Sequence, residues 1–168
     1  MRNKRIIIGG GGTGGHVFPA ISIARALMKK IPDTEILFVG AEGKLEMEKV
    51  PEAGFEIIGL PVTGFRRKLS FSTFIFFINL WKSIWKSASI IRSFKPQLVI
   101  GVGGYASGPI MRAANKKNIP TVIQEQNSCA GITNRLLARK AKKIFVAYEG
   151  MEKYFPPEQR AMGADEDE

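Results

Sequence analysis

The sequence is poor in the side chains that staple secreted proteins or hold metals. It contains one cysteine, Cys129, and one histidine, His16, which exclude a disulfide framework and a transition-metal cluster. Cys129 has no acid near it except Glu125, so we interpret it as inert packing. No run of 18 apolar residues is present, and a charged N-terminus leads directly into Ile6–Ile8. We therefore expect neither a transmembrane helix nor a signal peptide, and predict a protein of the reducing cytoplasm.

Acidic residues are absent from one long stretch of the chain. The whole sequence has 25 Lys and Arg against 15 Asp and Glu, a net charge of +10. None of the acids lies between Glu56 and Glu125, whereas many of the cations do. Such an excess predicts an anionic partner, and nucleic acid, anionic lipid and phosphorylated small molecules all qualify.

The pattern of the chain predicts one α/β domain. Short apolar segments with β-branched residues alternate with amphipathic segments, which is typical of a Rossmann-like, doubly wound parallel sheet. We expect six strands, at 5–9, 35–39, 55–60, 97–101, 121–124 and 143–147, and helices at 17–30, 44–50, 72–94, 107–117 and 132–140. Residues 1–157 would form the domain, and residues 158–168, which end in four acids, a flexible tail left by truncation or by the way the chain was expressed.

A glycine-rich loop follows the first predicted strand. Six of the seven residues from Gly9 to Gly15 are glycine, so backbone N–H groups can approach a phosphate beside a helix N-terminus. His16, where loop meets helix, is a candidate general base or a hydrogen-bonding partner of the loop. The same loop fits G-x-G-x-x-G, which would suggest a dinucleotide site with Glu42 as the ribose-binding acid.

Two further segments follow the ends of neighbouring strands in the predicted sheet. Gly101–Pro109 is a second glycine loop, and two such loops suit a diphosphate; its Tyr105 either lines the site or covers the loop. The segment that starts at Gln124 is rich in amide side chains, which recognise sugar hydroxyls. Glu125 would be a second base, a sugar ligand or the ion-pair partner of Arg135.

The long predicted helix carries many aromatic residues. One stripe is expected to face the sheet: Phe74, Phe77, Ile78, Trp81, Ile84, Trp85 and Ala88. A second group is apolar, lies off that stripe, and is surrounded by cations: Phe71, Ile75 and Phe76, with Arg66, Arg67, Lys68, Lys82 and Lys86. An apolar tip ringed by cations suits an anionic membrane surface, and cover by a loop or partner domain is the alternative.

Three motifs in register resemble one known family. GGGTGGHVFP at Gly10–Pro19, GVGGYASGP at Gly101–Pro109 and EQNSCAGITN at Glu125–Asn134 are similar to the N-terminal half of the MurG family. That resemblance implies the N-terminal half of a GT-B glycosyltransferase, which binds the membrane-borne acceptor. The family transfers N-acetylglucosamine from UDP-GlcNAc to lipid I to form lipid II, with inversion and without metal or other cofactor.

The resemblance also implies roles for residues of this chain. His16 would be the catalytic base, and Asn127 and Glu125 would contact the sugar or the donor. The acceptor pyrophosphate would be bound by Gly11, Gly12, Thr13, Gly14, Gly15, Gly103, Gly104 and Tyr105. The partners implied are lipid I, UDP-GlcNAc mainly through a further domain, and the anionic cytoplasmic face of the bacterial inner membrane, with no nucleic acid.

The chain departs from the family pattern in two respects. Family members are about twice as long and carry a donor domain, so we expect the 168 residues by themselves to bind acceptor but to turn over negligibly. Gln124 stands where many relatives have histidine. The competing hypotheses are a non-catalytic module for membrane or anionic headgroups, a nicotinamide-dependent oxidoreductase domain and a nucleic-acid binder.

Overall fold

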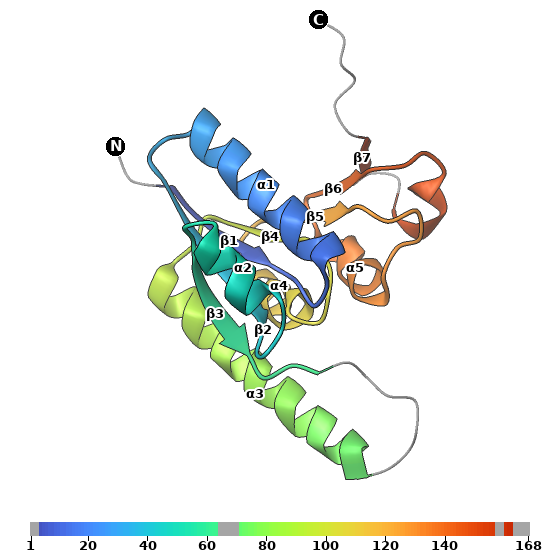
Figure 1. The fold of residues 1–168 in the computed structure, drawn as a ribbon. Helices are drawn as coiled ribbons and strands as arrows, with labels where there is room; N and C mark the ends of the chain where they lie inside the picture. Colours follow the sequence, from blue (N-terminus) through green and yellow to red (C-terminus); the bar gives the residue numbers. More distant parts are fainter. Residues whose placement is uncertain (1–3, 64–70, 157–159, 163–168) are drawn as a thin grey trace, which may run out of the picture.

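The computed structural model describes residues 4–63, 71–156 and 160–162 (Figure 1). Its strands are β1 (Lys4–Gly9), β2 (Thr34–Ala41), β3 (Glu56–Leu60), β4 (Leu98–Gly101), β5 (Thr121–Glu125), β6 (Lys143–Val146) and β7 (Arg160–Met162). The α-helices are α1 (Gly14–Lys30), α2 (Glu46–Glu52), α3 (Phe71–Phe94), α4 (Ser107–Lys116) and α5 (Ile132–Leu137), with short 3-10 turns η1 (Ala138–Lys140) and η2 (Met151–Tyr154).

The strands form one parallel sheet in the order β3-β2-β1-β4-β5-β6-β7. This confirms the doubly wound α/β class. Six strands lie where the sequence predicts them, and β7 adds a seventh that pairs with β6 inside the segment assigned to the tail. The helix predicted at 132–140 is divided into α5 and η1. The boundary predicted at residue 157 lies outside the described residues.

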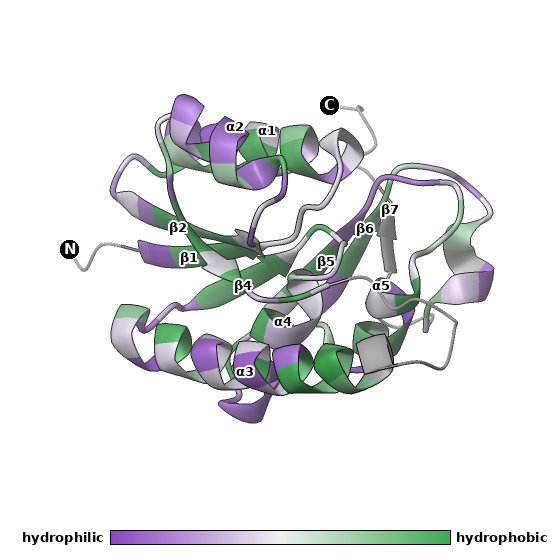
Figure 2. Ribbon diagram, turned by 60° about the horizontal axis from the view of Figure 1, so that its bottom comes forward, coloured by the Kyte–Doolittle hydropathy of each residue, from purple (hydrophilic) through white to green (hydrophobic). Residues whose placement is uncertain are grey.

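Helices cover both faces of the sheet, with α1 and α2 on one side and α3 and α4 on the other (Figure 2). Alternate residues of β1 serve the two layers: Ile6 and Ile8 pack with α1, whereas Ile7 belongs to the cluster that includes residues of α3 and α4. All three side chains are buried. Because both faces are covered, the strand is apolar from Ile6 onward.

Successive strands are added first on one side of β1 and then, from β4 onward, on its other side. The chain leaves β1 towards β2 and β3, and returns through α3 to pair β4 with the other side of β1. In an open parallel sheet, the loops at such a point diverge and leave a crevice at the carboxyl ends of the strands. Both glycine loops lie there, because one follows β1 and the other follows β4.

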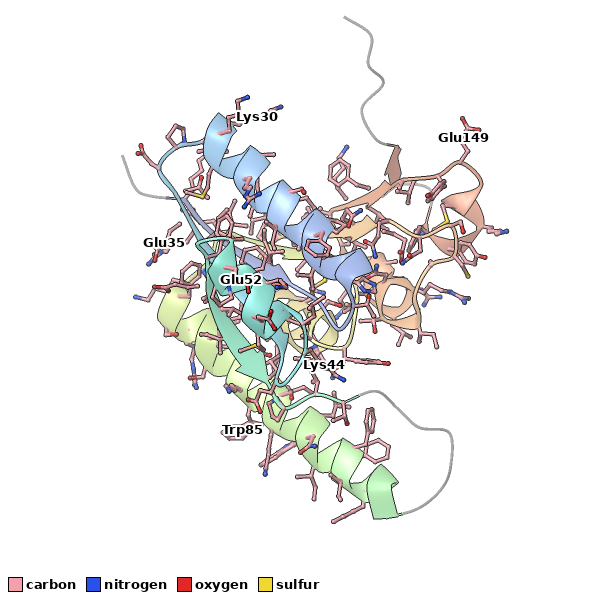
Figure 3. All side chains as sticks on the ribbon, viewed as in Figure 1. Lys30, Glu35, Lys44, Glu52, Trp85 and Glu149 are labelled. Atoms are coloured by element: carbon pink, nitrogen blue, oxygen red, sulfur yellow. The ribbon has the colours of Figure 1, made fainter. Side chains whose placement is uncertain are left out.

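The orientation of α3 differs from the sequence prediction. Phe74, Phe77, Ile78, Trp81 and Trp85, expected to face the sheet, are 36–63% exposed. Figure 3 shows Trp85 projecting from α3 away from the sheet, and in Figure 2 the N-terminal half of α3 is largely hydrophobic. None of the helices in the described ranges is long and apolar enough to cross a bilayer.

The face that α3 buries is partly made of small residues. Ser83 and Ser87 are fully buried, and Ile90 and Ile91 join the core near the C-terminal end. The serine hydroxyl of Ser83 is satisfied by the carbonyl of Asn79 at 2.7 Å. Small side chains let α3 pack closely against its neighbours, so its buried face need not be its most hydrophobic face. The prediction, which used hydrophobicity alone, therefore chose the wrong face. In addition, 24 residues of helix span about 36 Å, so the N-terminal half of α3 extends beyond the sheet (Figure 1).

The orientation of α3 can be tested by enlarging one serine on each face. Ser87→Leu should destabilise the fold by about 1–3 kcal/mol, because added methylenes must fit into a packed interior. Ser89→Leu, on the exposed face of the same helix, should change stability by less than about 0.5 kcal/mol. Urea unfolding of both variants measures this. Equal losses would show that Ser87 does not face the interior.

Candidate functional site

The first glycine loop is held between β2 and the start of α1. The N–H of Gly10 donates to the carbonyl of Val39 at 3.0 Å, and Gly12 has a φ of +97°, which favours glycine. Helix α1 begins directly afterwards, and the carbonyl of Thr13 accepts the N–H groups of His16 and Val17. This loop therefore delivers the N-terminus of α1 to the carboxyl edge of the sheet.

The second glycine loop touches the first. The N–H of Gly11 donates to the carbonyl of Gly103 at 3.2 Å. At Gly104, with a φ of +83°, a Cβ would overlap the carbonyl oxygen of Gly11, so only glycine fits between the two backbones. Ser107 then closes the turn into α4 by donating its hydroxyl to the carbonyl of Gly104 at 2.9 Å.

Several amides of the two loops have no partner within the described part of the chain. The N–H groups of Gly11 and Gly12 are already used, by the Gly103 carbonyl and by the Glu46 carboxylate. Those of Thr13, Gly14, Gly15, Gly103 and Gly104 meet no acceptor among the described residues. N–H groups of this kind, at the positive end of a helix, bind anions. Of the residues predicted to bind pyrophosphate, Gly11 and Gly12 thus have N–H groups that already meet an acceptor within the protein.

His16 is half-buried between the loops. Its Nδ1 lies 2.9 Å from Oγ1 of Thr13. A Cβ atom placed on Gly103 would lie 2.9 Å from Nε2 of His16. Burial lowers the pKa of His16 below the ordinary 6.5, against the opposing influence of the Glu125 and Glu46 carboxylates. When Nδ1–H donates to Thr13, Nε2 holds a free electron pair beside the second loop. This geometry fits a neutral general base.

The carboxylate of Glu125 is buried. It is 1% exposed, and its oxygens accept from the N–H and side-chain amide of Asn127, the N–H of Gly131 and the side-chain amide of Asn134, all at 3.0–3.1 Å. Its carboxylate organises the loop between β5 and α5, and the predicted sugar contact of Glu125 stays a prediction. Asn127 is exposed, and its amide is oriented by that carboxylate.

The structure also shows the surroundings of three further residues discussed above, Tyr105, Cys129 and Arg135. Tyr105 is half-exposed, with its ring 4.0 Å from where a Cβ of Gly12 would lie, so it flanks the first loop. Cys129 is exposed, with Sγ 3.6 Å from the hydroxyl of Tyr154, so its assignment to packing is wrong. Arg135 lies over the ring of Tyr154 and forms no ion pair with Glu125 in the described structure.

The residues predicted to meet a membrane are only partly described. Arg66, Arg67 and Lys68 lie outside the described residues, as does the side chain of Phe71. Ile75 and Lys82 are exposed and Phe76 is half-buried. Lys86 is exposed, and its ammonium forms an ion pair with Glu42 at 3.0 Å.

Sequence analysis missed Glu46. Its carboxylate is buried and accepts the N–H groups of Gly12 and Ala41, at 2.8 and 2.9 Å. A Cβ at Gly11 or Gly40 would overlap this side chain. Glycines near the ends of two adjacent strands, followed by an acid at the start of a helix, are the signal that could have indicated it, although Glu42 and Glu48 lie close by in the sequence.

Residues 6–146 match the glycosyltransferase family 28 N-terminal domain. The chain belongs to this family. Among curated relatives of the domain, the UDP-N-acetylglucosamine--N-acetylmuramyl-(pentapeptide) pyrophosphoryl-undecaprenol N-acetylglucosamine transferase of Bacteroides thetaiotaomicron is 59% identical over 161 residues. That alignment covers 96% of this chain and 43% of the relative. The enzyme of the same name from Cytophaga hutchinsonii is 54% identical over 152 residues, 90% of this chain and 41% of the relative. The chain thus spans less than half the length of these curated relatives.

Solved structures agree on the fold of this family 28 domain. The crystal structure of Acinetobacter baumannii MurG superposes with a TM-score of 0.80 at 29% identity, over 95% of this chain and 45% of that one. A UDP-GlcNAc 2-epimerase from Neisseria meningitidis superposes with a TM-score of 0.65 at 11% identity, over 95% and 45%, which shows the fold alone. The domain therefore corresponds to the N-terminal half of a GT-B glycosyltransferase.

The pKa of His16 is directly measurable, because it is the only histidine in the chain. NMR titration of its ring should give a pKa below 6.5. His16 would then bind its proton more tightly in the unfolded chain than in the folded one. The free energy of unfolding should therefore fall as the pH drops below about 6.5, whereas above that pH His16 should not affect how it depends on pH. A measured pKa above 6.5 would contradict the neutral imidazole.

Proposed function

We propose that this domain is the acceptor-binding half of an enzyme that transfers N-acetylglucosamine from UDP-GlcNAc to lipid I. The relatives named above carry this activity in their names. The observation that supports it in this chain is the position of Nε2 of His16 beside Gly103, between two glycine loops with free amides. A base and an anion site at one edge of the sheet suit an acceptor that has both a hydroxyl and a diphosphate.

The diphosphate of the acceptor would bind where the two loops meet. The N–H groups of Thr13, Gly14 and Gly15 belong to the positive end of α1, and those of Gly103 and Gly104 belong to the neighbouring loop. The glycines leave the backbone accessible to a group as bulky as a phosphate. Tyr105 would flank the bound group, since its ring lies beside Gly12.

The transfer would begin at His16. Its Nε2 removes the proton from the 4-hydroxyl of the acceptor's N-acetylmuramoyl group, and that oxygen attacks the anomeric carbon of N-acetylglucosamine. The bond from that carbon to the UDP oxygen breaks, UDP leaves with the electron pair, and the configuration inverts. Asn127, oriented by Glu125, would hold the sugar. The first step requires a neutral imidazole, and the burial that lowers the pKa of His16 favours this form.

A nicotinamide site is the less favoured interpretation of the same loop. It needs Glu42 free to bind a ribose, whereas its carboxylate pairs with Lys86. A dinucleotide fold also has no need for the second loop, which this structure packs directly against the first.

Binding of a soluble short-prenyl lipid I analogue tests the acceptor site. The analogue at about 100 times its Kd should stabilise the 168-residue chain by about 2.7 kcal/mol, because it binds only the folded form. UDP-GlcNAc and NAD should give little stabilisation. His16→Ala should retain the binding but, in a protein that also carries a donor domain, lose about 10²–10⁴-fold in kcat. Stabilisation by NAD alone would overturn the proposal.

We also propose that α3 docks the domain on the anionic cytoplasmic face of the bacterial inner membrane. Its exposed face carries Phe74, Phe77, Trp81 and Trp85, which are 57–63% exposed. The two indole rings lie 5.4 Å apart, and Lys82 adds positive charge. Aromatic side chains beside cations favour the boundary between headgroups and acyl chains.

Tryptophan fluorescence measures this docking directly, because the only two tryptophans of the chain lie on that face. Vesicles with phosphatidylglycerol should shift the emission to the blue, and neutral phosphatidylcholine vesicles should do so less. Phe74→Ser with Phe77→Ser should weaken binding about tenfold or more, since each buries an apolar ring. Leu136→Ser, which removes an exposed leucine from α5, is the matched control and should change nothing. An equal effect of the control, or no shift at all, would contradict docking through α3.

A further inference from the structure

We propose that Glu46 is a positioning residue: its buried carboxylate fixes the first glycine loop, so that His16 and the free amides of Thr13–Gly15 face a bound anion. The bound anion would be the acceptor diphosphate, so this part of the inference rests on the proposed function. The hydrogen bond from the first glycine loop to Glu46 does not depend on the proposed function.

The burial of Glu46 requires an explanation. Its side chain is 1% exposed, and an ionised carboxylate without partners in a protein interior is costly. Its described partners are backbone amides: Oε2 accepts from Gly12 at 2.8 Å and Oε1 from Ala41 at 2.9 Å. No Lys or Arg lies within ion-pair distance in the described ranges. The charge is therefore stabilised by the loop, and the loop by the charge.

The surrounding backbone is shaped to admit this side chain. At Gly11, with a φ of +137°, a Cβ would overlap the Glu46 carboxylate, and at Gly40 it would overlap Cγ. Gly11 follows β1 by two residues, whereas Gly40 lies near the end of β2. Glu46 therefore joins the carboxyl ends of two adjacent strands, just before α1 begins.

This contact determines which amides remain for a ligand. Because Glu46 occupies the N–H of Gly12, and Gly103 that of Gly11, the N–H groups that meet no acceptor in the described part of the chain begin at Thr13. Thr13 in turn orients the ring of His16 through Oγ1 and Nδ1. Loss of the carboxylate would release Gly12 and change the path of the three residues before His16. The negative charge of Glu46 also acts on the imidazole, since it raises the pKa of His16 against the effect of burial.

Glu46→Gln tests the proposal, because it keeps the shape of the side chain but removes the charge and one acceptor. In the 168-residue chain, the N–H of Gly12 or Ala41 should exchange with solvent about tenfold faster, as expected for one hydrogen bond. The pKa of His16 should fall further, since one of the two carboxylates that raise it is gone. Glu46→Asp, which restores the charge on a shorter side chain, should return the His16 pKa towards the wild-type value. Glu42→Gln, an exposed acid in the preceding turn, is the control and should change neither readout.

Titration with inorganic pyrophosphate separates this inference from the proposed function. Glu46→Gln should alter pyrophosphate affinity at least threefold while Glu42→Gln does not, because only Glu46 contacts the loop. If wild-type chain binds no pyrophosphate, the proposed acceptor site fails, while amide exchange and the His16 pKa still decide the role of Glu46. Should Glu46→Gln not fold, exchange in the wild-type chain decides: unprotected Gly12 and Ala41 amides would overturn the proposal. Unchanged exchange and an unchanged His16 pKa in a folded Glu46→Gln variant would also overturn it.

Discussion

The site of this domain depends on the close contact of two backbones. Gly11 donates its N–H to the carbonyl of Gly103, and Gly104 approaches Gly11 so closely that no side chain would fit. This contact is possible because the sheet brings β1 and β4 together as neighbours. It places the imidazole of His16 above the second loop. Without it, the second loop with Gly103 and Gly104 would not lie beside His16 and the N–H groups of Thr13, Gly14 and Gly15.

Buried carboxylates hold this arrangement in a protein that is otherwise strongly basic. Glu46 accepts hydrogen bonds from Gly12 in the first loop and from Ala41. Glu125 accepts hydrogen bonds from the N–H groups of Asn127 and Gly131 in the segment after β5. Each is nearly inaccessible to solvent. Both also act on His16, whose pKa reflects a balance between burial and their negative charge. These two acids are therefore structural supports of the loops around His16.

Helix α3 shows where sequence patterns mislead. Its aromatic stripe has the spacing of a core face, yet Trp81 and Trp85 are about 60% exposed and Ser83 and Ser87 are buried. Periodicity identifies an apolar face but cannot tell whether the rest of the molecule or an external surface covers it. The N-terminal half of α3 is exposed because it extends beyond the sheet (Figure 1). In the other half, Ser83 and Ser87 face the interior and leave Trp85 on the outer face.

The sequence by itself determined the strand and helix order, the doubly wound fold and the two glycine loops, because these depend on local apolar periodicity and on glycine. It also determined the family, through motifs whose residues are adjacent along the chain. Only the tertiary structure decided that the amides of Gly11 and Gly12 are occupied, that Glu125 is buried, and that Glu46 braces the loop. These facts depend on contacts between residues far apart in sequence, such as the 34 positions that separate Gly12 from Glu46, and no local pattern encodes them.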